Sequence, residues 1–397
     1  MTAERPCPLC GSREPEVLGR FNFAALDRSA LESALVLQTC RECGFAYHDV
    51  ADPAGLSAHY QGQAVFDYLQ GSGLSSDELT RQDHEDTFRT VRAFFNAPTP
   101  SWTDVGCGRG GFLFYLKSQG LNEVQGVDMN PDCVGYLRQN GLRAELSTGP
   151  GLPLADRSTE VISFNCMLEH VYDPGALLRE ARRVLSPGGL LYVEVPDAEA
   201  YGQTPWHDCF QWLLPEHINH FSLNHLSTLV ADSGFEILDG RRKIMNRNTV
   251  GSSPMIWVAA RPASAPAVFQ VPAAERGGLR REIERQIIRN QAYVQSRLET
   301  IDRLVTEGRP LYLWALSTAF WYYYGHSSLA RGNIKGLVDR NENFAGHTLS
   351  GRPVRNLSAL AEAGPEDLVL IFNYGQRQRM VDYLKEINFP GEHLVLV

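Results

Sequence analysis

The chain has 397 residues, of which 43% are hydrophobic and 21% charged, and its formal net charge is −9 at pH 7. This composition is typical of a folded globular protein, and the length predicts two or three domains. A nucleic-acid surface requires clustered Lys and Arg, so the acidic balance argues against a nucleic-acid partner. We find no apolar stretch as long as a membrane span and no charged-then-apolar leader, which predicts a cytoplasmic protein without a membrane partner.

Four of the eight cysteines form two C-x₂-C pairs, Cys7 with Cys10 and Cys40 with Cys43. Each pair can place two thiolates on one tight turn, and four thiolates form a closed tetrahedral zinc site. The alternatives are a disulfide pair or a redox dithiol, and a cytosolic enzyme would not keep disulfides. We therefore expect a structural Zn²⁺ site with no open position for chemistry. The other cysteines are expected to be small core residues: Cys107, Cys133, Cys166 and Cys209.

Residues 1–60 are expected to form a short module that the metal stabilises. A connector over 61–98 follows, in which an aromatic, Gly/Ser/Asp-rich stretch precedes a helix capped by S-S-D at 75–77 and running through Phe95. Such a segment could cover a ligand cleft. The small core of the N-terminal module would come from Phe21, Phe23, Leu31, Leu35, Val36 and Leu37.

A glycine-dense turn, D-V-G-C-G-R-G-G at 104–111, lies between a predicted strand and a predicted helix at 112–119. Glycines let the backbone turn sharply and approach a ligand, and the start of a helix offers free N–H groups. Asp128 closes the next predicted strand, Val124–Asp128, where a carboxylate can accept both ribose hydroxyls of a nucleoside. A dinucleotide site requires G-x-G-x-x-G order, whereas here Asp104 leads a G-x-G-x-G pattern.

This pattern resembles motif I of class I S-adenosylmethionine (SAM) methyltransferases. After a predicted strand at 161–164, N-C-M-L-E-H-V at 165–171 looks like the family's fourth-strand motif. A predicted helix at 179–185 ends in S-P-G-G at 186–189, which precedes a strand at 190–195 and looks like the family's L-x-P-G-G signature.

The resemblance covers about residues 89–260 and implies a Rossmann-like SAM-binding domain over 99–261. It leaves one position open, since the acidic residue that the family often places near the adenine amine has no clear counterpart here. Glu145 and Ser147 are the candidates. The resemblance implies these cofactor-binding residues: Asp104, Gly106, Cys107, Gly108, Gly110, Asp128, Met129, Asn165 and Leu168.

The C-terminal third predicts a linker and long helix over 262–308 and then a smaller α/β unit over 309–397. The helical pattern at 276–307 has apolar residues at spacings of three and four. Buried strands are predicted at 310–316, 334–339 and 368–372, alternating with helices. Where related chains carry a G-A-G-like turn after the first strand, this chain has A-L-S-T-A at 315–319. We therefore expect a Rossmann-like unit whose own ligand site is altered or absent.

A zinc module, a SAM domain and a terminal α/β unit in this order resemble the three-part C-methyltransferases that act on nucleotide-linked 4-keto sugars. The phrases that carry the resemblance are C-R-E-C-G at 40–44, P-E-H-I-N-H-F-S at 215–222, G-L-V-D-R-N at 336–341 and I-F-N-Y at 371–374. The resemblance spans nearly the whole chain. It implies a small-molecule substrate, a nucleotide-linked deoxysugar of natural-product biosynthesis, and leaves the oligomeric state open.

A carbon next to a ketone is too weakly acidic to be alkylated while neutral, so carbon methylation requires a base and an oxyanion stabiliser. Glu216-His217 matches the group's E-H pair, which favours His217 as the base and Glu216 as the residue that orients it or holds a sugar hydroxyl. The resemblance gives His170 a substrate-side or proton-transfer role. The group has a tyrosine where this chain has Pro215, and Tyr68 could replace that phenol.

Each of these residues also has a structural interpretation. His217 could simply bond a backbone carbonyl, His170 could start a helix, and Tyr68 could be a core aromatic. The alternative function is an O- or N-methyltransferase of another small or carrier-bound metabolite, which keeps the SAM motifs without enolate stabilisation. A non-catalytic SAM-binding protein is the third possibility.

Overall fold

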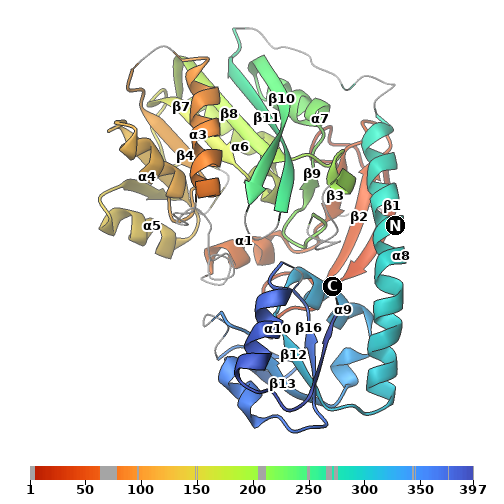
Figure 1. The fold of residues 1–397 in the computed structure, drawn as a ribbon. Coiled ribbons are helices and arrows are strands. Elements are labelled where there is room, and N and C mark those ends of the chain that lie inside the picture. Colours follow the sequence, from red (N-terminus) through yellow and green to blue (C-terminus); the bar gives the residue numbers. More distant parts are fainter. Residues whose placement is uncertain are drawn as a thin grey trace.

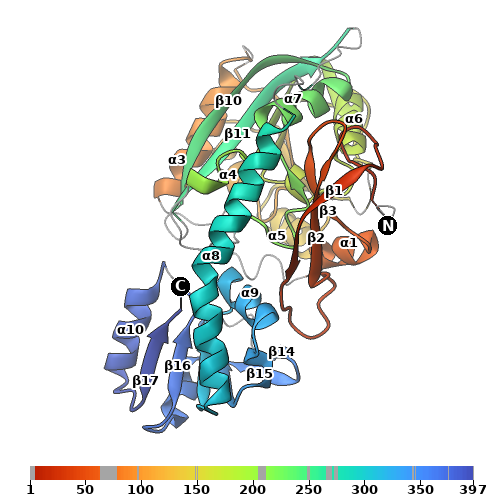
Figure 2. The ribbon, with the colours of Figure 1, turned by 90° about the vertical axis from the view of Figure 1, so that its right-hand side faces the viewer.

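The computed structural model describes residues 5–62, 78–95, 98–147, 149, 151–203, 212–247, 251–264, 271, 276–341, 344, 346–373 and 375–396. Among them the chain forms three β-sheets with surrounding helices. The long helix α8 (Gly278–Thr306) runs from the upper unit to the C-terminal sheet (Figures 1 and 2). Some of the sequence predictions lie outside the described residues: Tyr68, the predicted helix cap at 75–77, Cys209 and Tyr374.

The largest sheet has seven strands in the order β10-β11-β8-β7-β4-β5-β6. The strands from β8 to β6 are parallel, and β11 and β10 join antiparallel at one edge. Every residue of the central strand β4 is buried, because helices pack on both faces. The strands are β4 (Trp102–Val105), β5 (Val124–Asp128), β6 (Arg143–Leu146), β7 (Thr159–Asn165), β8 (Leu185–Pro196), β10 (Phe235–Arg247) and β11 (Gly251–Pro262).

Two groups of helices cover this sheet. The first group, α3 to α5, packs its apolar residues on one face, and α6 and α7 pack on the other. Asp173 caps α6 by accepting a hydrogen bond from the Ala176 N–H at 2.8 Å, and Pro174 fills the first turn. The helices are α3 (Glu78–Arg92), α4 (Gly111–Ser118), α5 (Pro131–Gln139), α6 (Pro174–Val184) and α7 (Leu223–Asp232).

Helix α6 ends at Val184, just before S-P-G-G at 186–189, as predicted, but the expectation that the next strand begins only at Leu190 is wrong. Strand β8 begins directly at Leu185, which pairs with Thr159, and the register then shifts so that Leu190 pairs with Val161. The prolyl and glycyl residues are therefore the bulge of a long strand, since a bulge accommodates residues that have no partner across the ladder.

The second sheet shows that the N-terminal segment does not have a core of its own. Its order is β1-β2-β3-β9, so its last strand comes from a segment near residue 220. Phe21, Phe23, Leu35 and Leu37 pack in one cluster with α8 and α9, Leu31 packs elsewhere, and Val36 is only partly buried. The strands are β1 (Pro15–Asn22), β2 (Ala34–Cys40), β3 (Ala46–Asp49) and β9 (Asn219–His220), and α1 (Pro53–Gln61) follows β3.

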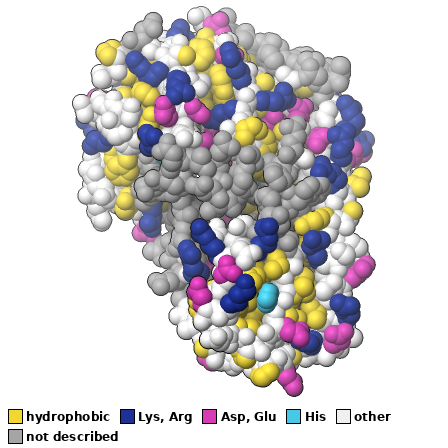
Figure 3. All heavy atoms as spheres, in the orientation of Figure 1, with side chains coloured by type: hydrophobic (Ala, Val, Ile, Leu, Met, Phe, Trp, Pro, Cys, Tyr) yellow, Lys and Arg dark blue, Asp and Glu magenta, His cyan; other side chains and the backbone are white. Residues whose placement is uncertain are grey.

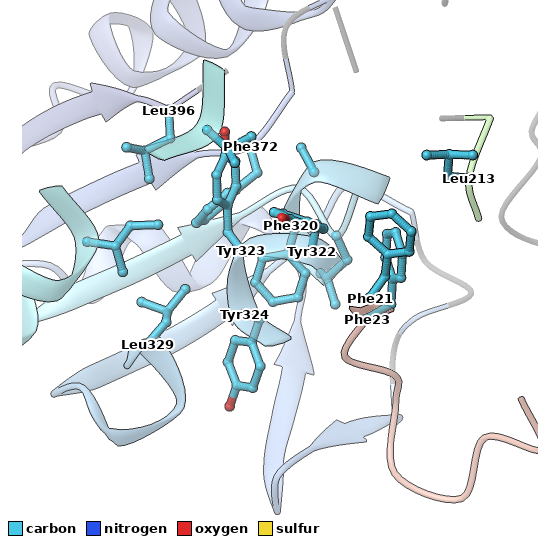
Figure 4. Packing of buried hydrophobic residues seen from close by; sticks show 14 of the residues in the cluster. Phe21, Phe23, Leu213, Phe320, Tyr322, Tyr323, Tyr324, Leu329, Phe372 and Leu396 are labelled. Carbon is cyan, nitrogen blue, oxygen red and sulfur yellow. The ribbon is translucent and has the colours of Figure 1, made fainter. Parts of the chain in front are cut away.

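The third sheet, in the order β14-β15-β13-β12-β16-β17, is parallel except for β14. Phe320 and Tyr323 of α9 pack against Phe372, and Tyr322 of the same helix packs against Phe23 (Figure 4). The strands are β12 (Leu311–Trp314), β13 (Ile334–Val338), β14 (Thr348–Leu349), β15 (Arg352–Arg355), β16 (Leu368–Ile371) and β17 (Glu392–Val395). The helices are α9 (Thr318–His326) and α10 (Arg377–Glu386). Short 3₁₀ turns complete the chain: η1 (Leu168–His170), η2 (Tyr201–Gln203), η3 (Leu329–Arg331) and η5 (Leu357–Glu362).

The joint between α9 and β1 allows a stability prediction. A Cβ on Gly325 would lie 1.9 Å from the Asn22 carbonyl oxygen, so Gly325→Ala should separate the two elements. We expect this change to destabilise the protein by about 1–3 kcal/mol, as overpacking does, and to lower the thermal unfolding midpoint. Gly135→Ala in α5 is the matched control, because no atom lies within 4 Å of its added Cβ. Equal midpoints for the two variants would contradict the packing at this joint.

The face of the molecule in Figure 3 carries Lys, Arg, Asp and Glu side chains over the described residues of both units. None of the described helices is long and apolar enough to cross a membrane.

Candidate functional site

The glycine turn connects β4 to α4 at the carboxyl edge of the seven-stranded sheet. Gly106 and Gly110 have φ of 74° and 76°, a left-handed conformation that glycine adopts without strain. A Cβ on Gly106 would lie 2.5 Å from Met167 Cγ, and one on Gly110 would lie 2.3 Å from Leu137 Cδ2. The turn therefore has room for backbone alone, and it packs against the loop that follows β7.

Asp128 closes β5 and holds this turn in place. Its Oδ2 accepts a hydrogen bond from the Gly108 N–H at 2.7 Å, and its Oδ1 accepts one from the Asn130 N–H at 2.9 Å. The side chain is almost completely buried, and burial raises the pKa of the carboxyl group, while hydrogen bonds from backbone N–H groups, that of Met129 among them, oppose the shift. A carboxylate with fixed orientation thus stands at the edge where parallel sheets bind nucleosides.

Asp104 and Asn165 meet between the turn and the end of β7. Asp104 Oδ1 accepts hydrogen bonds from Ser163 Oγ at 2.6 Å and from Asn165 Nδ2 at 2.8 Å. Burial raises the pKa of Asp104 to about 7, against these two hydrogen bonds. The Oδ1 atom of Asn165 is buried and has no hydrogen-bond partner among the described residues.

That orphaned acceptor is the feature that fits SAM. SAM carries a ribose and a cationic amino-acid group, and the site offers an oriented carboxylate at Asp128 and an unpartnered amide oxygen at Asn165. Asp128 ends β5 and Asn165 ends β7, and these two strands flank β4. The two groups therefore lie at the same edge of the sheet, on either side of the glycine turn. Leu168 is fully buried beneath this edge, and Cys107 is half-buried in the turn itself.

The two candidates for the adenine side differ in position. The Ser147 N–H donates to the Asp128 carbonyl oxygen at 2.9 Å, and its hydroxyl donates to the Gly151 carbonyl oxygen. Glu145 instead pairs with Arg138 at 3.2 Å, and both side chains are about half exposed. Ser147 is therefore the candidate that lies beside the nucleoside carboxylate.

A second group of polar residues lies where η1 meets the loop before β9. The rings of His170 and His217 are 4.9 Å apart between centroids. One ligand atom from each of Glu169, His170 and His217 lies within 4.8 Å of the others. The structure thus brings together His170, Glu216 and His217, which were predicted from two separate motifs, whereas the predicted Tyr68 lies outside the described residues.

His217 has the electrostatics of a neutral histidine. Burial and the neighbouring His170 lower its pKa to about 3, while the Glu216 carboxylate and a hydrogen bond to the backbone of Trp212 oppose the shift. Its Nδ1 is buried and has no partner among the described residues. A neutral imidazole with a free ring nitrogen can accept a proton.

Two residues of α1 belong to this group and were not predicted. Tyr60 Oη lies 2.7 Å from His170 Nδ1, and His59 Nε2 lies 3.5 Å from Glu216 Oε1. At the end of the same helix the Gly62 carbonyl accepts from Asn130 Nδ2 at 2.8 Å. Helix α1 therefore connects the histidine group to the nucleoside end of the site.

His225 and His220 have partners that fit structural roles. His225 Nε2 lies 3.1 Å from the Cys43 carbonyl oxygen and its Nδ1 lies 2.6 Å from Ser222 Oγ. Tyr201 Oη lies 3.1 Å from His220 Nδ1. His225 thus ties α7 to the cysteine cluster.

The cysteine cluster brings all four predicted ligands together. Cys7 Sγ lies 3.6 Å from Cys43 Sγ, Cys10 Sγ lies 3.5 Å from Cys40 Sγ, and the four sulfur atoms lie within 4.8 Å of one another. Tetrahedral zinc with Zn–S bonds of about 2.3 Å requires sulfur separations of about 3.8 Å. The cluster therefore has dimensions that fit a closed zinc site.

The turn of the C-terminal unit shares two features with the glycine turn, although its glycines are missing. Ala315 adopts φ of 74°, and the Leu316 N–H donates to Asp339 Oδ2 at 2.8 Å, as the Gly108 N–H donates to Asp128. Ala315 and Leu316 stand where glycines would leave room for a ligand, so an altered or absent ligand site in this unit stays a prediction.

A glycine turn after the middle strand of a parallel sheet, with a buried carboxylate closing the next strand, defines a nucleoside-binding Rossmann-like fold. Residues 79–239 match the family model described as a methyltransferase domain. This region is therefore a methyltransferase domain.

Curated relatives include an uncharacterized 37.1 kDa protein in a transposon of Streptomyces fradiae, 34% identical over 130 residues, and a probable S-adenosylmethionine-dependent methyltransferase of Mycolicibacterium smegmatis, 30% identical over 138 residues. The alignments cover 30% and 34% of this chain, and 38% and 52% of the two relatives. The chain thus spans about half, or less, of the length of these relatives. A SAM-dependent methyltransferase structure from Methanosarcina mazei aligns with 44% of this chain and 97% of that chain, with 20% identity and a TM-score of 0.38.

Proposed function

We propose that this chain is a SAM-dependent C-methyltransferase that methylates a carbon next to a ketone, on a nucleotide-linked 4-keto deoxysugar. The observation that carries the proposal is the buried, unpartnered Nδ1 of His217 beside His170, next to the loop that follows β7. A carbon acid needs a base without a competing partner to remove its proton, whereas a neutral amine acceptor is nucleophilic without one. We propose domain limits at 1–60, 61–98, 99–261, 262–308 and 309–397.

SAM, when bound, supplies an electrophilic methyl group. The chain's own residues would position it: Asp128 would hold the ribose hydroxyls, and Asn165 Oδ1 would accept from the ammonium group. His217 Nδ1 would take the proton from the acceptor carbon. Glu216, held by His59, would face the charge that develops on His217. Proton removal and alignment are what such a site contributes.

The second candidate function is O- or N-methylation of another small or carrier-bound metabolite. The observation that favours it is Pro215, which stands where the sugar C-methyltransferase group has a tyrosine. A proline has no hydroxyl to stabilise an enolate oxygen. An acceptor oxygen or nitrogen would not need that stabilisation.

Heavy water separates the two functions. The protein is incubated with a panel of nucleotide-linked 4-keto deoxysugars in D₂O, with and without SAM. The masses of the products are then measured by mass spectrometry. The proposal expects solvent deuterium beside the ketone without SAM, and a methyl group at that carbon when SAM is present. If SAM binds and neither mass change occurs with any sugar, carbon methylation is excluded for the panel and the second candidate gains support.

We also propose that the four cysteines hold a structural zinc ion. We expect about one zinc per chain by elemental mass spectrometry, as one closed Cys₄ site requires, and a lower thermal unfolding midpoint after chelation. Cys40→Ser should lose the metal, because it removes one of four ligands. Cys133→Ala, a buried cysteine of α5 outside the cluster, is the control and should keep it. A metal-free native protein with an unchanged midpoint would refute the zinc assignment.

A further inference from the structure

The hydrogen bonds around His170 determine where its ring proton lies. His170 Nδ1 is 2.8 Å from the Glu216 carbonyl oxygen and 2.7 Å from Tyr60 Oη. A carbonyl oxygen can only accept, so a contact of this length requires that Nδ1 carry the proton. The tautomer follows from the network because the only partner without a hydrogen is the carbonyl.

This tautomer frees the proton of Tyr60. A protonated Nδ1 has no lone pair, so Tyr60 Oη cannot donate to it and acts only as an acceptor there. Among the described residues, His170 is the sole hydrogen-bond partner of the Tyr60 hydroxyl. The phenol proton is therefore available to a ligand. Tyr60 contacts His170, and the ring of His170 in turn lies beside that of His217, the proposed base.

The phenol is also rigid and stays protonated. Tyr60 packs with Val50, Leu56 and Ile218 in a small apolar cluster, and burial raises its pKa well above the ordinary value, with the Glu216 and Glu169 carboxylates adding to the shift. Helix α1 is fixed on both sides of it by the contacts of His59 and Gly62. A preorganised neutral donor is the kind of group that stabilises a developing negative charge.

We propose that the Tyr60 hydroxyl is a catalytic residue, the donor that binds the ketone oxygen of the acceptor and stabilises the enolate. The C–H bond beside the ketone breaks, its proton moves to His217 Nδ1, and the electron pair moves onto the oxygen that Tyr60 holds. Tyr60 keeps its proton throughout. This assignment rests on the proposed carbon methylation, and it supplies the phenol that Pro215 removes.

The test measures solvent-deuterium exchange into the keto sugar, which reports enolate formation without methyl transfer. Tyr60→Phe is expected to lower both exchange and methylation by about 10²–10³-fold, the usual cost of one oxyanion donor, with SAM affinity by calorimetry unchanged. Tyr172→Phe is the matched control, since Tyr172 packs against the same apolar cluster and no hydrogen bond joins its hydroxyl to His170 among the described residues.

A second variant guards against a merely structural loss. Fluorotyrosines incorporated at position 60 have more acidic phenols and keep the ring, so the exchange rate should change in step with the phenol acidity. Wild-type exchange that Tyr60→Phe leaves intact would overturn the assignment of Tyr60 while carbon methylation stands. A wild-type protein that methylates an oxygen or nitrogen and exchanges no deuterium would overturn the proposed function, and the role of Tyr60 with it.

Discussion

Replacing Asp128 with asparagine is expected to lower the affinity for SAM by about 100-fold. Each carboxylate oxygen accepts one backbone N–H, from Gly108 and from Asn130, and an amide must turn its own NH₂ toward one of them. A buried donor left without an acceptor costs about 1–3 kcal/mol, and a hydrogen bond from a ribose hydroxyl to a charged group contributes about 1.5–3 kcal/mol. A loss near 3 kcal/mol corresponds to about two powers of ten.

Calorimetric titration with SAM measures this effect, and Asp132→Asn is the matched control. Asp132 is the exposed acidic residue in the first turn of α5, four positions from Asp128 in the chain, and removing its charge should leave the affinity unchanged. If the two variants bind SAM equally well, Asp128 does not hold the nucleoside and the cofactor site must be placed elsewhere.

The nucleoside side of the site was predictable because its signal is local. Gly106, Gly108 and Gly110 take left-handed conformations that other residues adopt with strain, and Asp128 comes directly after an apolar strand. A short segment therefore specifies both the turn and the carboxylate that holds it. The clustering of the four cysteines was predictable in the same way, since two short spacings pair them along the chain.

The histidine side of the site was predictable only in part. Tyr60 and His170 are separated by 110 positions, and His59 meets Glu216 across a still longer interval. Nothing in the apolar pattern of α1 distinguishes a residue that faces a site from one that faces the core, because both are partly buried. The pairing of β3 with β9 was missed for a related reason. Strand β9 has only two residues, so it has no periodicity that the sequence could reveal.

Replacing His217 with glutamine is expected to lower the rate of carbon methylation by about 10²–10⁴-fold, the usual contribution of a general base. Glutamine retains hydrogen-bonding atoms of similar reach, but its amide cannot take a proton from carbon. SAM affinity should be unchanged, since the cofactor groups lie on the sheet edge. His347→Gln, at an exposed position of the C-terminal unit, should have no effect on either measurement.

The pH dependence provides an independent check of the same residue. A base works in its neutral form, which predominates above its pKa, and the pKa of His217 in the free protein is lowered to about 3 by burial and by His170. The ratio kcat/KM should therefore be flat with respect to this group between about pH 5 and pH 8, whereas an ordinary histidine would give an inflection near pH 6.5. An inflection near that value, absent in His217→Gln, would show that His217 is solvated and not the buried base.

A low pKa also limits how strongly His217 can pull a proton from carbon, because the driving force for proton transfer falls with the basicity of the acceptor. The site must then gain more from stabilising the enolate oxygen, which places a larger share of the barrier on Tyr60. The two groups should be coupled. Removing Tyr60's hydroxyl in the His217→Gln background should cost less than it does in the wild type, because enolate formation already fails without the base. A double-mutant cycle on the deuterium exchange rate measures this coupling, and fully additive losses would mean that the two residues act on separate steps.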